Sequence, residues 1–142
     1  MKFLVLNGPN LNLLGTREPD VYGNETLSEI GDWLSNQPEG ADHELTWFQS
    51  NHEGDLIDQI HAATSRFDGV IINPGALTHY SYALKDALAS ITVPTVEVHL
   101  SDIYTRESFR HISLIKDECI SQISGLGKTG YLEALKTLIN YI

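Results

Sequence analysis

The chain has 142 residues, of which 42% are hydrophobic and 20% are charged, as expected for one globular domain large enough to bury a core. Nineteen acidic and nine basic residues give a formal net charge of −10. Without a basic cluster, this charge argues against nucleic acid as a partner. No apolar run approaches the roughly 18 residues of a membrane span. With the single Cys119 and no signal-peptide pattern, we expect a cytoplasmic protein.

The apolar residues follow a pattern that predicts alternating strands and helices. In chain order, we expect a strand at 2–7, a long loop at 8–23, a helix at 26–37, a strand at 44–49, a helix at 53–65, a strand at 69–73, a helix at 79–90, a strand at 95–100, a loop with a short helical turn, a strand at 119–124 and a helix at 130–142. Thr26 and Glu29 match a capping box at the start of the first helix.

This alternation predicts an α/β fold in which one five-stranded parallel sheet carries helices on both faces. No linker or internal repeat interrupts the chain, so we assign residues 1–142 to a single domain. Ligands of such sheets bind beyond the carboxyl ends of the strands. The residues that follow 7, 49, 73, 100 and 124 are therefore the ones to inspect for a functional site.

The stretch GPNLNLLGTREPDVYG, residues 8–23, is a long loop for a compact domain. It carries Arg17 and Tyr22 five residues apart, and Gly15 and Gly23 are candidate hinges. A phenol beside a guanidinium loses its proton more readily, because the cation stabilises the phenolate. The loop therefore indicates a flap that brings a base and a cation together over a ligand.

Polar residues also gather after the third and fourth predicted strands. Glu97 and His99 are two residues apart, so they share one face of the fourth strand. Each residue alone fits an ordinary surface, capping or structural role. Together they predict a site with an acid, a base and a clamp for an anion. The residues at this edge are Asn73, His79, Glu97, His99, Ser101, Arg110 and, as a candidate lid residue, Arg106.

Three other patterns point weakly to different ligands. GLGKTG at 125–130 fits the glycine spacing of a dinucleotide site, but no second strand or acidic ribose ligand follows it. It is not a P-loop either, because Gln122 stands where that loop needs glycine. Glu97, His99 and His79 do not match a strong zinc motif, since ligands two apart on a strand are not typical of one. We therefore predict no metal.

Four blocks resemble the signature segments of type II 3-dehydroquinate dehydratase, a shikimate-pathway enzyme. The resemblance follows the order and spacing of that family over nearly the whole chain. It implies a flavodoxin-like three-layer fold, a homododecamer built from trimers, and a reaction without cofactor. That reaction is the anti elimination of water from 3-dehydroquinate, through an enolate, to give 3-dehydroshikimate for aromatic amino acid biosynthesis. The blocks are NGPNLNLLGTREPDVYG, SNHEGDLIDQIH, INPGALTHYSYALKDAL and VEVHLSDIYTRESFR.

The resemblance also implies roles for the matching residues. Tyr22 is expected to take the C2 proton, with Arg17 stabilising the tyrosinate and the transition state. His99 is expected to protonate the departing hydroxyl, with Glu97 orienting it. The other matches are Asn10 near the site, Asn73, His79 and Arg110 at the ring hydroxyls, Leu100 and Ser101 at the carboxylate, and Asp86, which the family supplies from a neighbouring subunit.

The sequence departs from the family in places without losing a proposed catalytic group. Asp102 stands where many members have Asn, which brings a negative charge next to the expected carboxylate pocket. The other departures are Leu77, Tyr80, Tyr82 and Ile112.

Other functions remain open at this point. An imine mechanism is disfavoured, because none of the five lysines is predicted to be buried at a strand end. A phosphoacceptor receiver domain is disfavoured because the first strand ends in Asn7 without an acidic pair. The main alternatives are a non-catalytic flavodoxin-like module that binds a nucleotide or flavin, and a catalytically inactive scaffold.

Overall fold

Five parallel strands form one sheet in the order β2-β1-β3-β4-β5 in the computed structural model, which describes all residues from 1 to 142. This is the strand order of a flavodoxin-like doubly wound sheet, so the predicted fold is confirmed. The boundaries differ from the prediction only at the end of β4 and the start of β5. The strands are β1 (Lys2–Asn7), β2 (Glu44–Gln49), β3 (Gly69–Asn73), β4 (Thr95–His99) and β5 (Ser121–Ser124).

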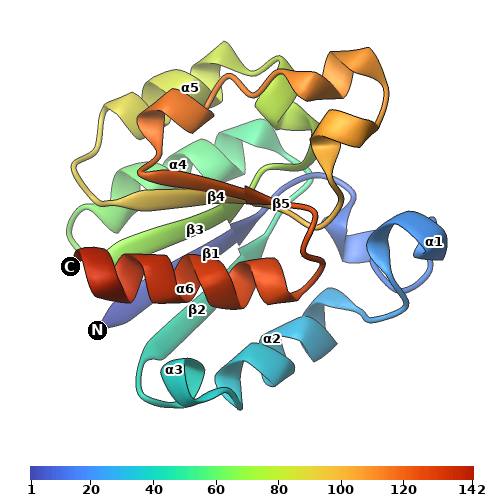
Figure 1. Cartoon of the computed structure of the whole chain (residues 1–142). Coiled ribbons are helices and arrows are strands. Elements are labelled where there is room, and N and C mark those ends of the chain that lie inside the picture. The colour runs from blue at the N-terminus through green and yellow to red at the C-terminus, as the bar shows by residue number, and fades with distance from the viewer.

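Helices cover both faces of the sheet (Figure 1). One face carries α2 (Leu27–Ser35), α3 (Pro38–Ala41) and α6 (Thr129–Tyr141), and the other carries α4 (Glu53–Ala63) and α5 (Tyr82–Ala89). The short α3 was not predicted. None of these helices combines the length and the apolar character that crossing a membrane requires.

Each face of the sheet has its own apolar core. Phe3 belongs to the cluster under α2 and α6, whereas its neighbour Leu4 belongs to the cluster under α4 and α5. Successive residues of a strand point to opposite faces, so the uninterrupted apolar sequence of β1 reflects burial on both sides.

The predicted helix at 79–90 begins later than expected, and that boundary was wrong. Residues Gly75–His79 form a 3-10 helix, η2, and α5 starts at Tyr82. Ser81 separates the two helices, because its backbone is extended and its hydroxyl oxygen accepts a hydrogen bond from the Leu84 amide at 2.9 Å, as a helix N-cap does. His79 therefore lies in a short turn at the carboxyl edge of the sheet.

Both long loops contain short helical turns. The opening loop holds η1 (Leu11–Leu13) and α1 (Pro19–Tyr22), and the segment after β4 holds η3 (Ile103–Thr105), η4 (Ser108–His111) and η5 (Lys116–Glu118). Gly15 and Gly23, on either side of α1, have φ angles of +92° and +86°. Residues with a side chain rarely adopt these angles, so the turns on either side of α1 require glycine.

Candidate active site

A cavity opens beyond the carboxyl ends of β1, β3 and β4, at the edge where the sequence predicts a site. Glu97 does not line the cavity itself but contacts His99, which does. Asp86 is the one predicted site residue that lies neither in the cavity wall nor against it. Arg106 also lines the cavity. The predicted residues that line it are Asn10, Arg17, Tyr22, Asn73, His79, His99, Leu100, Ser101 and Arg110.

Glu97 and His99 form the innermost part of the site. Both side chains point to the same face of β4, as predicted, and His99 Nε2 lies 2.5 Å from Glu97 Oε2. Glu97 is fully buried and His99 is 5% exposed. Because the carboxylate engages Nε2, Nδ1 is the imidazole nitrogen that remains for a ligand.

Four donors satisfy the buried Glu97 carboxylate. Besides His99, it accepts hydrogen bonds from the hydroxyls of Thr78 (2.6 Å) and Ser113 (2.8 Å) and from the side-chain amide of Gln122 (3.1 Å). Burial alone would raise the pKa of Glu97, but the hydrogen bonds from His99, Thr78 and Ser113 outweigh it and hold the pKa below its ordinary value. Glu97 is thus a fixed anion that keeps the His99 ring in one orientation.

His79 faces His99, with the two rings nearly parallel and their centroids 6.5 Å apart. His79 Nδ1 donates a hydrogen bond to the Ile112 carbonyl oxygen at 2.7 Å, which leaves Nε2 as an acceptor for a ligand hydroxyl. Partial burial lowers the pKa of His79 despite this hydrogen bond, and the nearby charges of His99 and Arg110 add to the effect.

The lowered pKa of His79 predicts a loss of stability below about pH 6.5, the ordinary pKa of histidine. The unfolded chain binds this proton before the folded chain does. The contribution of neutral His79 is therefore complete above that pH and is lost as the pH falls through the folded pKa. We expect His79→Asn to lose less unfolding free energy than the wild type between about pH 7.5 and 5.5 in urea melts. Equal losses in the two proteins would assign the effect to another group.

Tyr22 ends α1, and two guanidinium groups surround its ring. Arg106 Nη1 donates a hydrogen bond to the Tyr22 hydroxyl at 2.9 Å, and its Cζ lies 5.3 Å from the ring centroid. Arg17 Cζ lies 5.0 Å from the same centroid. From the sequence, we predicted Arg17 as the cation beside Tyr22 and Arg106 only as a candidate lid residue. In the structure, Arg106 contacts the phenolic oxygen and Arg17 the ring.

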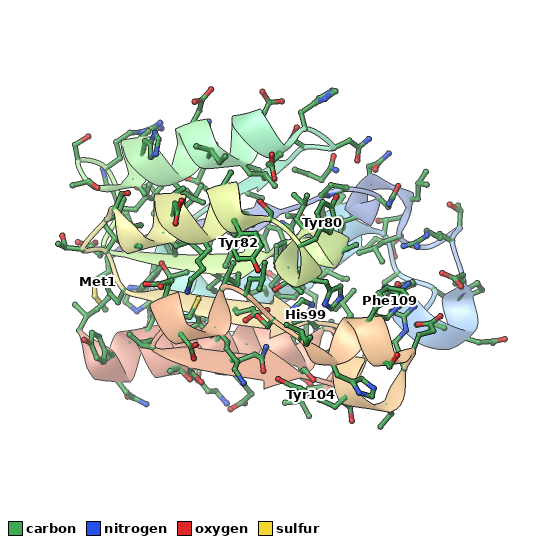
Figure 2. The ribbon with its side chains drawn as sticks, turned by 90° about the horizontal axis from the view of Figure 1, so that it is seen from above. Met1, Tyr80, Tyr82, His99, Tyr104 and Phe109 are labelled. Atoms are coloured by element: carbon green, nitrogen blue, oxygen red, sulfur yellow. The ribbon has the colours of Figure 1, made fainter.

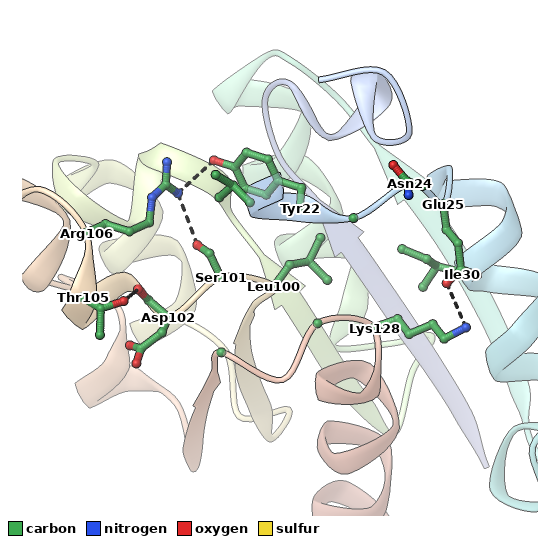
Figure 3. A pocket seen from close by; sticks show the side chains of 14 residues that line it. Tyr22, Asn24, Glu25, Ile30, Leu100, Ser101, Asp102, Thr105, Arg106 and Lys128 are labelled. Atoms are coloured by element: carbon green, nitrogen blue, oxygen red, sulfur yellow. Dashed lines mark hydrogen bonds and ion pairs between the residues drawn. The ribbon is translucent and has the colours of Figure 1, made fainter. Parts of the chain in front are cut away.

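Arg106 also joins Tyr22 to the end of β4 (Figure 3), because its Nη1 donates to Ser101 Oγ at 3.2 Å. The backbone amides of Leu100 and Ser101 have no partner within the chain, whereas their carbonyl oxygens accept hydrogen bonds from the amides of Gly127 and Gly125. Free amides beside an arginine are well suited to bind a carboxylate.

Asn73 is held rigidly at the end of β3. Its Nδ2 donates to the Tyr131 hydroxyl at 3.2 Å, and its Oδ1 accepts a hydrogen bond from the Gly75 amide at 3.2 Å. The Tyr131 hydroxyl donates in turn to Asn7 Oδ1 at 2.6 Å. Burial raises the pKa of Tyr131, so this phenol stays protonated and acts as a structural donor rather than as a second base.

Asp102, which stands where many members of the resembled family have Asn, has a local structural role. Its side chain accepts a hydrogen bond from the Tyr104 amide at 3.0 Å and so caps η3. Arg110 lines the cavity, and its Nε lies 2.5 Å from Glu107 Oε2. Glu107 therefore fixes the position of the Arg110 guanidinium at the rim.

A family model described as dehydroquinase class II matches residues 1–139. The chain belongs to the class II dehydroquinase family. Two 3-dehydroquinate dehydratases, from Bacillus licheniformis and Bacillus subtilis, are 56% and 54% identical to it over 137 and 138 residues. The alignments cover 96% and 97% of this chain and 94% and 93% of those relatives. The crystal structure of type II dehydroquinase from Butyrivibrio crossotus superposes with a TM-score of 0.94 at 48% identity, covering 98% of this chain and 97% of that one.

Family membership confirms the resemblance read from the sequence blocks, but three contacts of this class II dehydroquinase escaped that reading. Thr78, Ser113 and Gln122 all donate to Glu97. Thr78 precedes His79, and the other two come from segments with no motif. The contact of Gln122 could have been predicted from the alignment of the last two strands, because β4 and β5 pair Glu97 directly with Gln122.

Proposed function

We propose that this chain is a hydro-lyase that converts 3-dehydroquinate to 3-dehydroshikimate by anti elimination through an enolate, in aromatic amino acid biosynthesis. The Bacillus relatives are named for this activity. The proposal depends on one observation above all. A phenol and an imidazole, each hydrogen-bonded to a charged partner, line the same cavity together with arginines.

In the first step, the Tyr22 phenolate takes the C2 proton of the substrate. Arg106 donates to the phenolic oxygen and Arg17 lies over the ring, so both stabilise the negative charge before transfer. Closure of the flap between Gly15 and Gly23 excludes water and strengthens these interactions. The electron pair of the broken C–H bond moves into the enolate.

In the second step, the electrons of the enolate form a double bond between C2 and the neighbouring carbon that carries the leaving hydroxyl, and the hydroxyl departs. His99 supplies its proton from Nδ1, so the hydroxyl departs as water. The Glu97 carboxylate at Nε2 orients the ring and compensates the charge of the imidazolium. Both steps are proton transfers that these side chains perform themselves, so the reaction as proposed uses no cofactor.

The remaining residues hold the substrate. The free amides of Leu100 and Ser101, with the Ser101 hydroxyl, bind its carboxylate. The ring hydroxyls are bound by Asn73, His79 and Arg110, and Asn10 lies near them. Because the bound acid is an anion, these donors and arginines must overcome the negative charge of the rest of the chain.

We further infer a cytoplasmic homo-oligomer, a dodecamer built from trimers, in which Asp86 completes the site of a neighbouring subunit. Asp86 is exposed on α5 and does not line its own cavity. Tyr82 lies one helical turn before it and is 68% exposed, and Tyr80 is 64% exposed. These rings lie on the face viewed from above in Figure 2, where Phe109 is 56% exposed. Exposed aromatic side chains near Asp86 support contact with a second copy.

Mixing two inactive variants tests this arrangement. We expect Asp86→Ala and His99→Ala each to be poorly active, and mixed oligomers made by co-expression to regain activity. The gain arises where an Asp86→Ala subunit, with intact His99, receives Asp86 from its His99→Ala neighbour. Mixed oligomers without any gain would place Asp86 outside the partner's site, and a monomer in sedimentation would remove the interface altogether.

The proposed reaction is tested by a direct assay. The purified chain should convert 3-dehydroquinate to a conjugated enone that absorbs in the ultraviolet, and borohydride should not inactivate it in the presence of substrate. A lack of product, together with a rise in melting temperature on adding flavin, would favour the non-catalytic binding module instead.

A further inference from the structure

A chain of hydrogen bonds leads from the catalytic pair to the surface through two residues that the mechanism has not used. Gln122 Nε2 donates to Glu97 Oε1 at 3.1 Å, and the Tyr104 hydroxyl donates to Gln122 Oε1 at 2.5 Å. The contact between Gln122 and Glu97 is built into the sheet, because the two residues are register partners in β5 and β4. Their side chains therefore lie on the same face, in adjacent strands.

Apart from Ser113, which contacts both, the two oxygens of the Glu97 carboxylate have different partners. His99 and Thr78 contact Oε2, whereas Gln122 contacts Oε1 and Ser113 contacts both oxygens. The rotation of the carboxylate about its last bond decides where Oε2 stands relative to the imidazole. Gln122 and Ser113 both donate to the opposite oxygen, so Gln122 is one of two side chains that fix this rotation from Oε1 and thereby the orientation of His99.

Tyr104 connects this arrangement to the other side of the cavity. It lies in η3, which Asp102 caps, two residues before Arg106. Arg106 donates to the hydroxyl of Tyr22. One short segment, Ile103–Arg106, therefore contacts the proposed base directly and reaches the proposed acid through Gln122 and Glu97. Tyr104 is 44% exposed, so its hydroxyl has no structural need for this partner.

We propose that Gln122 and Tyr104 are positioning residues. They align His99 for proton donation and fix its position relative to the Ile103–Arg106 segment, which contacts the proposed base. This inference rests on the proposed function, because it assigns His99 as the acid. It adds that the acid is positioned from the Ile103–Arg106 segment as well as from its own strand.

Three variants test the inference. Gln122→Leu removes one of the two donors at Oε1 and leaves Ser113 in place. Loss of a hydrogen bond to a charged group corresponds to about a tenfold loss in kcat, and we expect KM to change less than about twofold. Tyr104→Phe leaves Gln122 in place but less well fixed, so we expect about a threefold loss. In the double variant, the loss should equal that of Gln122→Leu alone, because Tyr104 acts through Gln122. Tyr141→Phe, an exposed tyrosine of α6, is the matched control and should behave as the wild type.

Two further readouts separate positioning from general damage. Exchange of the C2 proton with solvent depends on Tyr22, so it should stay within about twofold of the wild type while elimination falls. Gln122→Glu should be impaired at neutral pH, where a second carboxylate faces Glu97, and should recover relative to the wild type as the pH falls and the new carboxyl gains a proton to donate. Gln122→Leu should show no such recovery.

The outcomes distinguish this inference from the function on which it rests. If the wild type does not dehydrate 3-dehydroquinate, the proposed function fails. If it does, normal kcat in Gln122→Leu overturns the positioning role of Gln122. Losses that multiply in the double variant overturn the connection through Tyr104. Exchange and elimination that fall together, with a lower melting temperature, reduce both residues to structural ones.

Discussion

Tyr22→Phe is expected to abolish turnover while the protein still binds its substrate. The substitution removes only the phenolic oxygen, which contacts Arg106 in the structure, and leaves the ring between the two guanidinium groups. Loss of a general base corresponds to about 10² to 10⁴-fold in kcat. Substrate binding measured by calorimetry should change far less, because we propose that other donors hold the carboxylate. Proton exchange at C2 should disappear with turnover.

The control for this variant is again Tyr141→Phe, which removes a phenol hydroxyl from the exposed end of α6. Near-normal turnover by Tyr22→Phe would assign the base to another residue. Tyr131 is not such an alternative, since it is buried and engaged with Asn7 and Asn73.

His99→Ala should separate the two halves of the reaction. The variant keeps Tyr22 and its arginines, so it should still exchange the C2 proton with solvent. Elimination should fall by about 10² to 10⁴-fold, because the leaving hydroxyl no longer receives a proton. Deuterium incorporation followed by NMR, alongside the ultraviolet assay, measures both rates on one sample.

Loss of exchange together with elimination would contradict a separate role for the acid. Glu97 complicates the variant, since His99→Ala leaves one carboxylate oxygen with fewer donors. His99→Gln is therefore the better-matched substitution for folding, because its side-chain amide can still donate to Glu97. The two variants should agree in their ratio of exchange to elimination.

The fold was predictable because its strands are buried on both faces. β1 and β3 are continuous apolar runs, and such runs separated by amphipathic helices specify a parallel sheet. Boundaries were harder to predict where a polar side chain competes with helix formation. Ser81 caps α5 and divides the predicted helix at 79–90, although Tyr80 fits its periodicity.

The site was predictable where short-range geometry decides it. Glu97 and His99 meet because side chains two apart on a strand share a face. The contact between Arg106 and Tyr22 joins residues 84 positions apart, and it depends on the conformations of two loops, which no local pattern encodes. The same holds for Gln122, whose neighbour is set by how β5 aligns with β4.

Three of the four arginines in the chain, Arg17, Arg106 and Arg110, line a single cavity. The whole chain, these arginines included, carries a formal charge of −10. The arginines concentrate positive charge at the cavity of an acidic protein, so an approaching acid is drawn there rather than to the rest of the surface. An ester or amide with the same ring would not experience this attraction. Electrostatic attraction during the approach thus distinguishes an acid from its neutral analogue before either makes contact with the cavity.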